Sequence, residues 1–377
     1  MMTVYNDLNT PERILLGPGP SMVEPRVLRA MAQPLLGHLD PMFIGLMKEV
    51  QELLRYVFQT KNELTLPISG TGSASMESTV ANLIEAGDEI LIGVNGYFGE
   101  RLCDMASRYG GVVNRLEKPW GEVVTPEEVD KALQKKPAKV VAVVHAETST
   151  GALTPLEDMG RVVHKHGALL LVDCVTSLGG VPVKIDEWDV DIAYSATQKC
   201  LSCPPGLGPL TVGERAREVI RKRKSKVPNW YLDLTMIEHY WGDERTYHHT
   251  APITMNFALR EALRIVQEEG LEKRFARHRE NSEMLWQGLE DLGLKCVVPK
   301  EHRLPSLTTV AVPEGVDEAA IRRSLLTEYN IEVAGGLGAF KGKVLRIGLM
   351  GYSSRRENIL LFLSAMEKLL KHAGQLH

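Results

Sequence analysis

Short apolar runs alternate with helical patterns through the first half of this chain, and that alternation limits the folds it can adopt. The runs have the length of strands and lie at residues 63–68, 89–93, 111–116, 139–145, 168–173 and 191–197. Helical patterns separate most of them, at residues 74–85, 98–109, 126–134 and 156–166. Strands connected through helices pair in parallel, so we predict an α/β fold whose mostly parallel sheet is covered by helices on both faces.

The rest of the pattern predicts further helices and a smaller α+β region. Helical patterns occupy residues 25–31, 41–58 and, as one long helix, 255–292; strands at 306–312 and 343–350 alternate with helices at 316–329 and 355–372. The start of the chain has no such pattern and ends in Gly17-Pro-Gly-Pro20, which favours an irregular path. We therefore expect an N-terminal arm over residues 1–20, a large domain over 21–265 and a small C-terminal domain over 266–377.

The composition argues against several classes of partner. The formal net charge is −4 over 377 residues, which gives no support for nucleic-acid binding. The basic run at 215–226 is best explained as the solvated face of a helix. No apolar stretch reaches the roughly 18 residues of a membrane helix, and no signal pattern opens the chain. We therefore expect a cytoplasmic protein without a membrane partner.

The cysteines are few and odd in number, which argues against a disulfide framework. Cys200 and Cys203 have the spacing of half a zinc site, but no second pair of cysteines or histidines accompanies them. We expect no metal site, and the role of this pair stays open. The five cysteines are Cys103, Cys174, Cys200, Cys203 and Cys296.

Two charged residues lie at the ends of predicted buried strands. Asp173 ends the run at 168–173, and Lys199 ends the strand predicted from 191–197. A buried charge is costly unless it is paired, neutralised or covalently used, and the carboxyl ends of parallel strands are where ligands bind. The two residues suggest pyridoxal phosphate, with the lysine bound to its aldehyde and the acid at its ring nitrogen. An ordinary buried ion pair, or two loop caps, is the alternative.

The loop Ser69-Gly-Thr-Gly-Ser73 joins a predicted strand to a predicted helix. Small residues at a helix N-terminus let backbone N–H groups approach an anion, so this loop is a candidate phosphate cradle. It is not a Walker A loop, because no Gly-Lys-Ser/Thr follows, and it lacks the acid expected of a dinucleotide site. A simple helix cap is the alternative. A candidate aromatic at Tyr97-Phe98 follows the cradle, and Asp173 and Lys199 come after it in the chain.

Read in order, these motifs resemble the class V, fold-type I pyridoxal-phosphate aminotransferases, and most closely their alanine–glyoxylate and serine–pyruvate/serine–glyoxylate branch. The resemblance covers essentially the whole chain. It implies a mostly parallel seven-stranded sheet in the large domain, pyridoxal 5′-phosphate as cofactor, and a homodimer. The matching segments are Leu15-Leu-Gly-Pro-Gly-Pro-Ser21, Ser69-Gly-Thr-Gly-Ser73, Asn95-Gly-Tyr-Phe-Gly99, His145-Ala-Glu-Thr-Ser-Thr-Gly151, Leu171-Val-Asp-Cys-Val-Thr-Ser-Leu-Gly-Gly180, Ser195-Ala-Thr-Gln-Lys199, Tyr247-His-His-Thr250 and Leu345-Arg-Ile-Gly348.

The resemblance also implies residues that hold the cofactor. Lys199 would be the Schiff-base lysine and Asp173 the partner of the pyridinium nitrogen. Phe98 would stack on the cofactor ring, where the animal relatives commonly have Trp, and Ser73 stands where relatives often have His. The residues around the phosphate would be Thr71, Gly72, Ser73 and Gln198.

Further residues would bind the substrate or reach across a subunit interface. Arg346 would clamp the substrate carboxylate, because a guanidinium makes two parallel charged hydrogen bonds. Gly19 would lie at the substrate, and Thr148 would contact the cofactor or substrate. Tyr247 and Thr250 would reach the phosphate of the neighbouring subunit, so that two chains build each site.

The activity implied is a ping-pong transamination through pyridoxamine phosphate, from alanine or serine to glyoxylate or pyruvate. The sequence leaves the donor open, and aspartate is another possibility. A lyase or cysteine desulfurase on the same fold is a rival, but it needs a nucleophilic cysteine on a mobile loop, and Cys296 lies in an apparent strand at 295–298. A non-catalytic relative is a second rival, against which the presence of Lys199, Asp173 and Arg346 argues.

Overall fold

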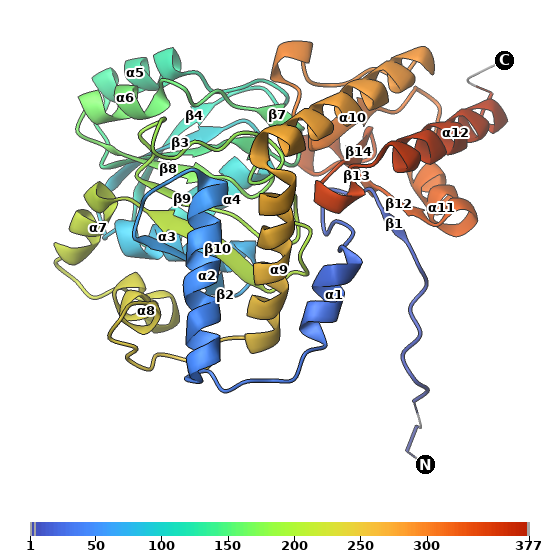
Figure 1. Ribbon diagram of the computed structural model, residues 1–377. Coiled ribbons are helices and arrows are strands. Elements are labelled where there is room, and N and C mark those ends of the chain that lie inside the picture. Colours follow the sequence, from blue (N-terminus) through green and yellow to red (C-terminus); the bar gives the residue numbers. More distant parts are fainter. Residues whose placement is uncertain (1, 4, 375–377) are drawn as a thin grey trace.

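The structure is a computed structural model that describes residues 2–3 and 5–374. Its centre is a seven-stranded sheet with the order β2-β10-β9-β8-β5-β3-β4 (Figure 1). All strands run parallel except β10, which is antiparallel to both of its neighbours. The predicted mostly parallel seven-stranded sheet is thus confirmed. The strands are β2 (Leu64–Ser69), β3 (Glu89–Val94), β4 (Val112–Glu117), β5 (Val140–Val144), β8 (Leu169–Asp173), β9 (Ile192–Tyr194) and β10 (Leu207–Val212).

The antiparallel strand β10 was not recognised in the sequence pattern. The segment before it, Pro204-Pro-Gly206, is rich in turn-forming residues, and Gly208 and Pro209 lie inside the strand itself. Proline removes a ladder donor and glycine weakens a strand, so both hide the strand pattern. The strand forms because all six of its residues are buried between β2 and β9.

Helices cover both faces of the sheet, as predicted (Figure 1). Buried side chains on one face come from α1 (Pro25–Met31), α2 (Pro41–Phe58), α5 (Pro126–Lys135), α6 (Met159–Lys165) and α9 (Ile253–Glu269). Those on the other face come mainly from α3 (Gly72–Leu83), α4 (Tyr97–Arg108), α7 (Glu214–Arg221) and α8 (Leu234–Trp241). The basic run begins in α7, where Ala216 and Ile220 are buried and Arg215 and Arg221 are exposed, which confirms the helix-face interpretation for that part of the run.

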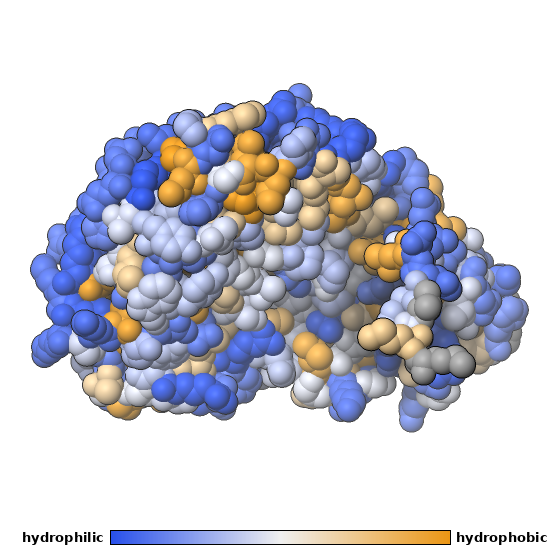
Figure 2. Space-filling model, turned by 90° about the horizontal axis from the view of Figure 1, so that it is seen from below, coloured by the Kyte–Doolittle hydropathy of each residue, from blue (hydrophilic) through white to orange (hydrophobic). Residues whose placement is uncertain are grey.

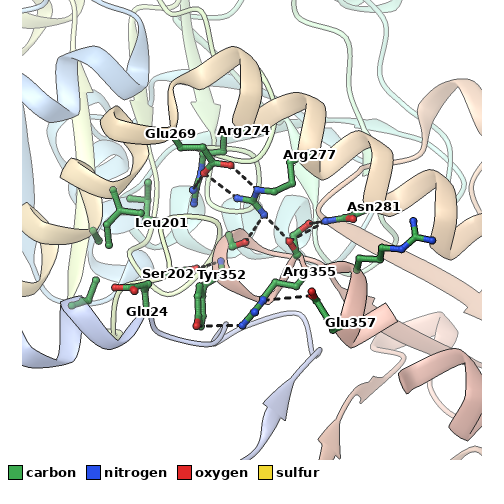
Figure 3. Close-up of a pocket in the computed structure, with 16 residues that line it drawn as sticks. Glu24, Leu201, Ser202, Glu269, Arg274, Arg277, Asn281, Tyr352, Arg355 and Glu357 are labelled. Carbon is green, nitrogen blue, oxygen red and sulfur yellow. Dashed lines mark hydrogen bonds and ion pairs between the residues drawn. The ribbon is translucent and has the colours of Figure 1, made fainter. Parts of the chain in front are cut away.

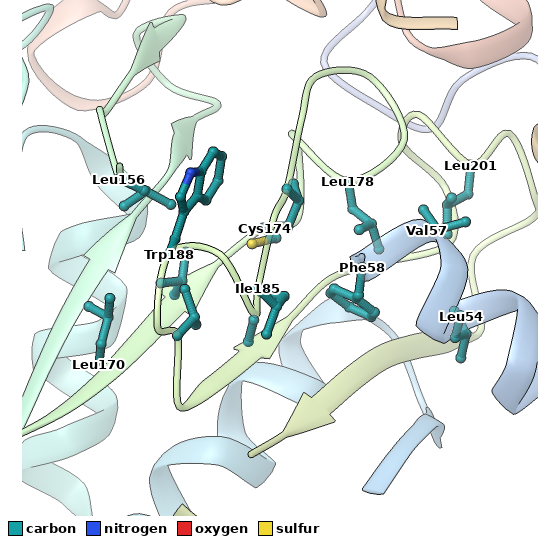
Figure 4. Packing of buried hydrophobic residues seen from close by; sticks show 14 of the residues in the cluster. Leu54, Val57, Phe58, Leu156, Leu170, Cys174, Leu178, Ile185, Trp188 and Leu201 are labelled. Atoms are coloured by element: carbon teal, nitrogen blue, oxygen red, sulfur yellow. The ribbon is translucent and has the colours of Figure 1, made fainter. Parts of the chain in front are cut away.

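The first cluster also fixes the path of the chain between Asp173 and Lys199. Figure 4 shows Leu178 and Leu201 packed near Phe58 and Val57 of α2, with Trp188 farther along the same layer. The long segment that connects β8 to β9 therefore buries apolar side chains at several points. Burial of this kind holds irregular backbone in one conformation, which the position of a reactive side chain requires.

The long helix predicted over 255–292 is wrong, because the chain forms two helices there. α9 ends at Glu269, and α10 (Leu271–Asp291) begins immediately after Gly270, whose φ is 80°. A residue in this left-handed region ends an α-helix, and glycine adopts it without steric cost. The break directs α10 away from the sheet and towards a third apolar cluster.

That third cluster lies in the C-terminal part of the chain, under a small antiparallel sheet with the order β11-β14-β13. Leu16 belongs to this cluster as well. The preceding residues form β1 (Ile14–Leu15), which pairs in parallel with β12 (Ile331–Glu332). The expectation of a wholly irregular arm over 1–20 is therefore wrong at residues 14–15. The expected domain boundaries stay a prediction. The elements here are β11 (Leu307–Ala311), α11 (Glu318–Tyr329), β13 (Ala334–Gly335), β14 (Val344–Gly348) and α12 (Arg356–His372).

The surface carries several exposed apolar side chains near the connection between α1 and α2. Leu28, Leu35, Leu39 and Met42 are 51%, 70%, 49% and 74% exposed. This connection lies at the bottom of Figure 1, and Figure 2, which views that side, shows apolar groups gathered on it. Among the described residues, no helix has both the length and the apolar character needed to cross a membrane.

Candidate active site

Three parallel strands bring the predicted site residues to one edge of the sheet. β2 ends at Ser69, β8 ends at Asp173, and the chain that leaves β9 leads to Lys199. A cavity of about 180 Å³ lies at this edge. Seven of the predicted residues line it, namely Thr71, Gly72, Ser73, Phe98, Asp173, Gln198 and Lys199, together with Met76, Arg101, Val175 and Ala196.

The candidate phosphate cradle is the start of α3, which begins at Gly72. Thr71 is the N-cap residue, and no side chain caps the helix. The positive end of the helix dipole and its first N–H groups therefore face the cavity side. A Cβ built on Gly72 would lie 2.7 Å from the Cβ of Ala196, so only glycine lets this helix start so close to the segment before Lys199. Ser75 strengthens that contact by donating from Oγ to the carbonyl of Ser195 at 2.8 Å.

Asp173 is a buried carboxylate at the end of β8, with 2% of its surface exposed. Its Oδ1 accepts a hydrogen bond from the backbone N–H of Val175 at 2.8 Å, and its Oδ2 accepts one from the hydroxyl of Tyr194 at 2.7 Å. Burial raises the pKa of Asp173 to about 6, although these hydrogen bonds and the charge of Lys199 oppose the rise. A cation bound beside it would favour its ionised form.

Lys199 is 9% exposed, and its Nζ donates to the carbonyl of Pro18. Burial, and next the positive charge of Arg346, lower the pKa of its ammonium to about 8. Gly19 lies against this amine, since a Cβ built there would be 2.6 Å from Nζ. An amine with such a pKa is partly neutral near neutral pH and can exchange a proton.

The predicted strand that ends at Lys199 is wrong in its length. β9 ends at Tyr194, and Lys199 lies five residues later in a turn. The turn closes because the N–H of Ser202 donates to the carbonyl of Lys199 at 3.0 Å and the N–H of Cys203 donates to Thr197 at 3.1 Å. These local bonds compete with the sheet for the same backbone groups, which the apolar pattern does not reveal.

Arg346 lies on β14, the middle strand of the small sheet, and is 5% exposed. Its Nε donates to the carbonyl of Gly335 at 2.8 Å, and its Nη1 donates to the carbonyl of Thr148 at 3.0 Å. Burial lowers the pKa of its guanidinium to about 10, which leaves it charged at neutral pH. Within the described part of the chain no carboxylate lies within 4.0 Å of it, and Nη2 has no hydrogen-bond partner.

Five predicted residues do not line the cavity. One is Gly19, described above; the others are Thr148, Arg346, Tyr247 and Thr250. Thr148 and Arg346 hydrogen-bond to each other, and the Thr148 hydroxyl bonds to that of Thr176. Tyr247 and Thr250 are both exposed, Tyr247 by 59%. Their loop is hydrogen-bonded to the candidate cradle through His249, whose Nε2 lies 2.6 Å from Oγ of Ser69. The single chain therefore does not bring Tyr247 and Thr250 into the cavity, and their role across subunits stays a prediction.

Two charged residues at the site had no role in the sequence-based prediction. Arg101 lines the cavity from α4, three residues after Phe98, and helical spacing alone places both on one face. Glu147, in β6 (Ala146–Glu147), is fully buried; its Oε1 accepts from the N–H and Oγ of Ser149 at 2.9 and 2.6 Å, and its Oε2 accepts from the N–H of Phe98 at 3.1 Å. An acid inside a buried segment was the available signal.

A larger cavity of about 460 Å³ lies behind the turn that carries Lys199, against Leu201 and Ser202 (Figure 3). The buried Arg274 and the half-buried Arg277 in its lining already have partners. Arg274 donates to the carbonyls of Gly179 and Cys200 and pairs with Glu269, while Arg277 pairs with the same Glu269 and donates to the carbonyl of Ser354. These contacts attach α10 to the turn that carries Lys199. Because this larger cavity is not lined by Asp173 or Lys199, the smaller cavity is the candidate active site.

The burial of Glu147 predicts a pH dependence of stability. Burial raises its pKa from 4.5 to about 7, so between these values the folded state holds a proton that the unfolded state has released. The free energy of unfolding therefore falls as pH rises through this window. Glu147→Gln has no proton to lose, so its unfolding free energy should fall less between pH 5 and 8, by up to about 3 kcal/mol, in denaturant titrations of the cofactor-free protein. The exposed Glu283→Gln serves as control, and an unchanged pH dependence of Glu147→Gln would contradict the assignment.

Comparison with known proteins identifies the family. The model of the Aminotransferase class-V family matches residues 14–361. An (S)-ureidoglycine–glyoxylate transaminase of Bacillus subtilis (strain 168) is 43% identical over 98% of this chain and 94% of its own length. Alanine–glyoxylate aminotransferase of Rattus norvegicus is 42% identical, over 97% of this chain and 89% of its own.

The architecture agrees with this match. The crystal structure of an alanine–glyoxylate aminotransferase from Nostoc sp. superimposes with a TM-score of 0.97 at 55% identity, covering 98% of each chain. The matches span both the region of the central sheet and the C-terminal region that carries Arg346. The chain belongs to the class V aminotransferases, enzymes of fold type I that transfer amino groups.

Proposed function

We propose that this aminotransferase uses pyridoxal 5′-phosphate to move an amino group from a small amino acid, alanine or serine, to a small 2-oxo acid, glyoxylate or pyruvate. The observation that carries the proposal is the convergence of the Lys199 amine, the Asp173 carboxylate and the start of α3 on one cavity. The names of the relatives cited above support it, since all three include glyoxylate and two of them include alanine. The cytoplasmic location expected from the sequence remains a prediction.

The residues of the cavity fit this cofactor. At one end, the uncapped start of α3 and the hydroxyls of Thr71 and Ser73 suit a phosphate. Within the described residues, the Gln198 Oε1 is buried without a hydrogen-bond partner. This oxygen accepts, so a donor on the ligand would satisfy it, whereas the NH₂ group of the same side chain could donate to the phosphate. At the other end, the Asp173 carboxylate suits a cationic ring nitrogen, and Lys199 offers the amine for the aldehyde. Phe98 would supply the aromatic face.

Pyridoxal phosphate, when bound, supplies an aldehyde that takes up the amino group and a ring that withdraws electrons from the Cα–H bond. The Lys199 amine would accept the Cα proton at Nζ and return it, for which a pKa of about 8 is suited. Asp173 would hold the ring nitrogen protonated through its carboxylate. Donor and acceptor would enter in turn, in a ping-pong order, and use the same residues.

Arg346 is the candidate for the substrate carboxylate. A structural salt bridge with a nearby acid would be the alternative role for a buried arginine, but Arg346 donates instead to two backbone carbonyls. These bonds fix the orientation of the guanidinium and leave Nη2 available. Its positive charge is one of the causes that lower the pKa of Lys199, and a carboxylate bound at Nη2 would offset that charge. Thr148 and Gly19 would complete this side of the site.

A desulfurase needs a reactive thiolate, and the cysteines do not support one. Cys296 makes only one isolated bridge to Val310, so the strand expected at 295–298 is wrong, but its side chain is 5% exposed and burial raises the pKa of its thiol. Cys200 follows Lys199 directly, yet burial raises the pKa of its thiol to about 11. A buried thiol with a raised pKa is a poor nucleophile.

We also propose a homodimer whose active sites are shared. The exposed apolar side chains around the α1–α2 connection support an interface. The exposure of Tyr247 and Thr250 supports their use by a second chain, because neither of them, among the residues that the structure describes, lines the cavity of its own chain.

Covalent attachment of the cofactor tests the role of Lys199. Borohydride treatment of the wild-type protein should fix about one cofactor per chain on the peptide that contains Lys199, because a buried amine of lowered pKa reacts with an aldehyde. Lys199→Ala should lose this attachment and all turnover, as measured by mass spectrometry and by transamination assays. The exposed Lys273→Ala is the control. Reducible cofactor on another lysine in the Lys199→Ala protein would show that the assignment is wrong.

The substrate proposal predicts the kinetics of Arg346→Lys. One ammonium cannot reproduce a bidentate guanidinium, so KM for alanine, serine and glyoxylate should each rise roughly 10- to 100-fold. The absorption spectrum of the bound cofactor should change little. Steady-state kinetics with alanine, serine and aspartate as donors, and glyoxylate and pyruvate as acceptors, also rank the substrates. Arg323→Lys, exposed on α11, should behave as wild type. Unchanged KM values in Arg346→Lys would place the carboxylate site elsewhere.

The dimer proposal predicts a loss of cofactor affinity without loss of assembly. Thr250→Ala should bind pyridoxal phosphate about tenfold more weakly, because one hydrogen bond to a charged group is removed, while Thr246→Ala in the same exposed loop should not. Sedimentation should show a dimer for both variants. A wild-type monomer that keeps full activity in dilute solution would overturn the proposal.

A further inference from the structure

Arg101 places its own positively charged guanidinium at the edge of the active-site cavity, beside the start of α3. Its Nη1 lies 3.3 Å from Oγ of Ser73, the second residue of that helix. Its guanidinium carbon lies 4.8 Å from the centroid of the Phe98 ring and 5.4 Å from that of Tyr97. Stacking on two rings of its own helix restricts the guanidinium, so its position relative to α3 is set by packing rather than by a charged partner.

The acids nearest to Arg101 on α4 are already paired with other arginines. Glu100 pairs with Arg115 at 2.6 Å, and Asp104 pairs with Arg108 at 2.9 Å. In the described ranges, 2–3 and 5–374, no carboxylate lies within 4.0 Å of the Arg101 guanidinium. Its one hydrogen bond there is to a neutral hydroxyl. A guanidinium in such surroundings has donors left for an anion.

The charges around the cavity also call for an anion at this end. Arg101 and Lys199 are both cationic, and Arg101 is among the charges that lower the pKa of Lys199. The start of α3 adds the positive end of a helix dipole. Asp173 is the carboxylate in the lining, and it hydrogen-bonds to Val175 and Tyr194. A phosphate monoester, with two negative charges and three acceptor oxygens, matches a guanidinium beside a helix N-terminus.

We propose that Arg101 is a phosphate-binding residue of the cofactor site, donating from its guanidinium to the phosphate that the start of α3 receives. The inference rests on the proposed use of pyridoxal phosphate and adds a residue to it. One turn of α4 would then supply both the aromatic face, from Phe98, and the cation, from Arg101. Because Glu147 accepts a hydrogen bond from the N–H of Phe98, the start of that turn is held in place.

The test compares pyridoxal phosphate with pyridoxal, which has the same ring and aldehyde but no phosphate. The full-length protein, stripped of cofactor, is titrated with each compound, and Kd is followed by absorbance. Arg101→Met, which keeps an unbranched stem but removes the charge, should raise Kd for pyridoxal phosphate roughly 10- to 100-fold and leave Kd for pyridoxal within about twofold. Arg101→Lys should recover part of the loss. Inorganic phosphate should compete with pyridoxal phosphate less well in Arg101→Met than in wild type.

Arg108→Met is the matched control, because Arg108 lies two turns farther along α4, is exposed and pairs with Asp104. It should bind both compounds as wild type does. Equal weakening of both compounds by Arg101→Met would assign Arg101 to the aromatic platform and overturn the proposal, as would no weakening of either. A raised KM for amino acids with unchanged Kd for pyridoxal phosphate would make it a substrate residue instead. Failure of wild type to bind pyridoxal phosphate at all would refute the proposed function rather than this assignment.

Discussion

The burial of two opposite charges at one edge of the sheet is the constraint on which the active site depends. Desolvation moves the pKa values of Asp173 and Lys199 towards each other, to about 6 and about 8. Each group is then close to exchanging a proton near neutral pH, which an exposed aspartate or lysine is not. Apolar packing on both sides of Lys199 in the sequence offsets the cost of this burial: Leu178, between the two charges, and Leu201, just after the lysine, both lie in the large apolar cluster (Figure 4).

Hydrogen bonds between distant segments hold the C-terminal part of the chain against this edge. Arg346 donates to the carbonyl of Thr148, Ser306 Oγ donates to the carbonyl of Thr176 at 2.8 Å, and the N–H of Leu304 donates to Gly151 at 2.9 Å. Arg274 and Arg277 also attach α10 to the carbonyl of Cys200, next to Lys199, and to the loop at Gly351 (Figure 3). The turn that carries Lys199 is thus held by residues far away in sequence, which is how a flexible side chain is kept near one position.

Two charged residues connect the separate elements of the site through hydrogen bonds that only the folded chain shows. Glu147 connects the start of α4 to the loop that carries Thr148, since it accepts from Phe98 and from Ser149. Arg101 connects the same helix to the start of α3 through Ser73. The aromatic residue, the candidate phosphate cradle and the candidate substrate side are therefore joined through α4. A change in the position of α4 would alter all three together.

The sequence by itself determined the class of fold, because apolar strands that alternate with helices have few ways to bury their side chains other than in a mostly parallel sheet. It also determined that Asp173 and Lys199 end up at one sheet edge, since parallel strands share the edge at which their carboxyl ends lie. The ordered motifs then pointed to the family. These are local patterns, each contained in a short stretch of chain.

Only the tertiary structure decided which distant residues meet. The antiparallel β10 forms because β2 and β9 offer paired edges, although Gly208 and Pro209 disfavour a strand locally. Gly270 ends a helix whose apolar pattern continues on both sides, since burial in two different clusters requires a change of direction. Arg101 has donors to spare because Glu100 and Asp104 bind other arginines, and Arg346 bonds to carbonyls rather than to an acid. Such partnerships depend on distances across the folded chain, which residue spacing does not contain.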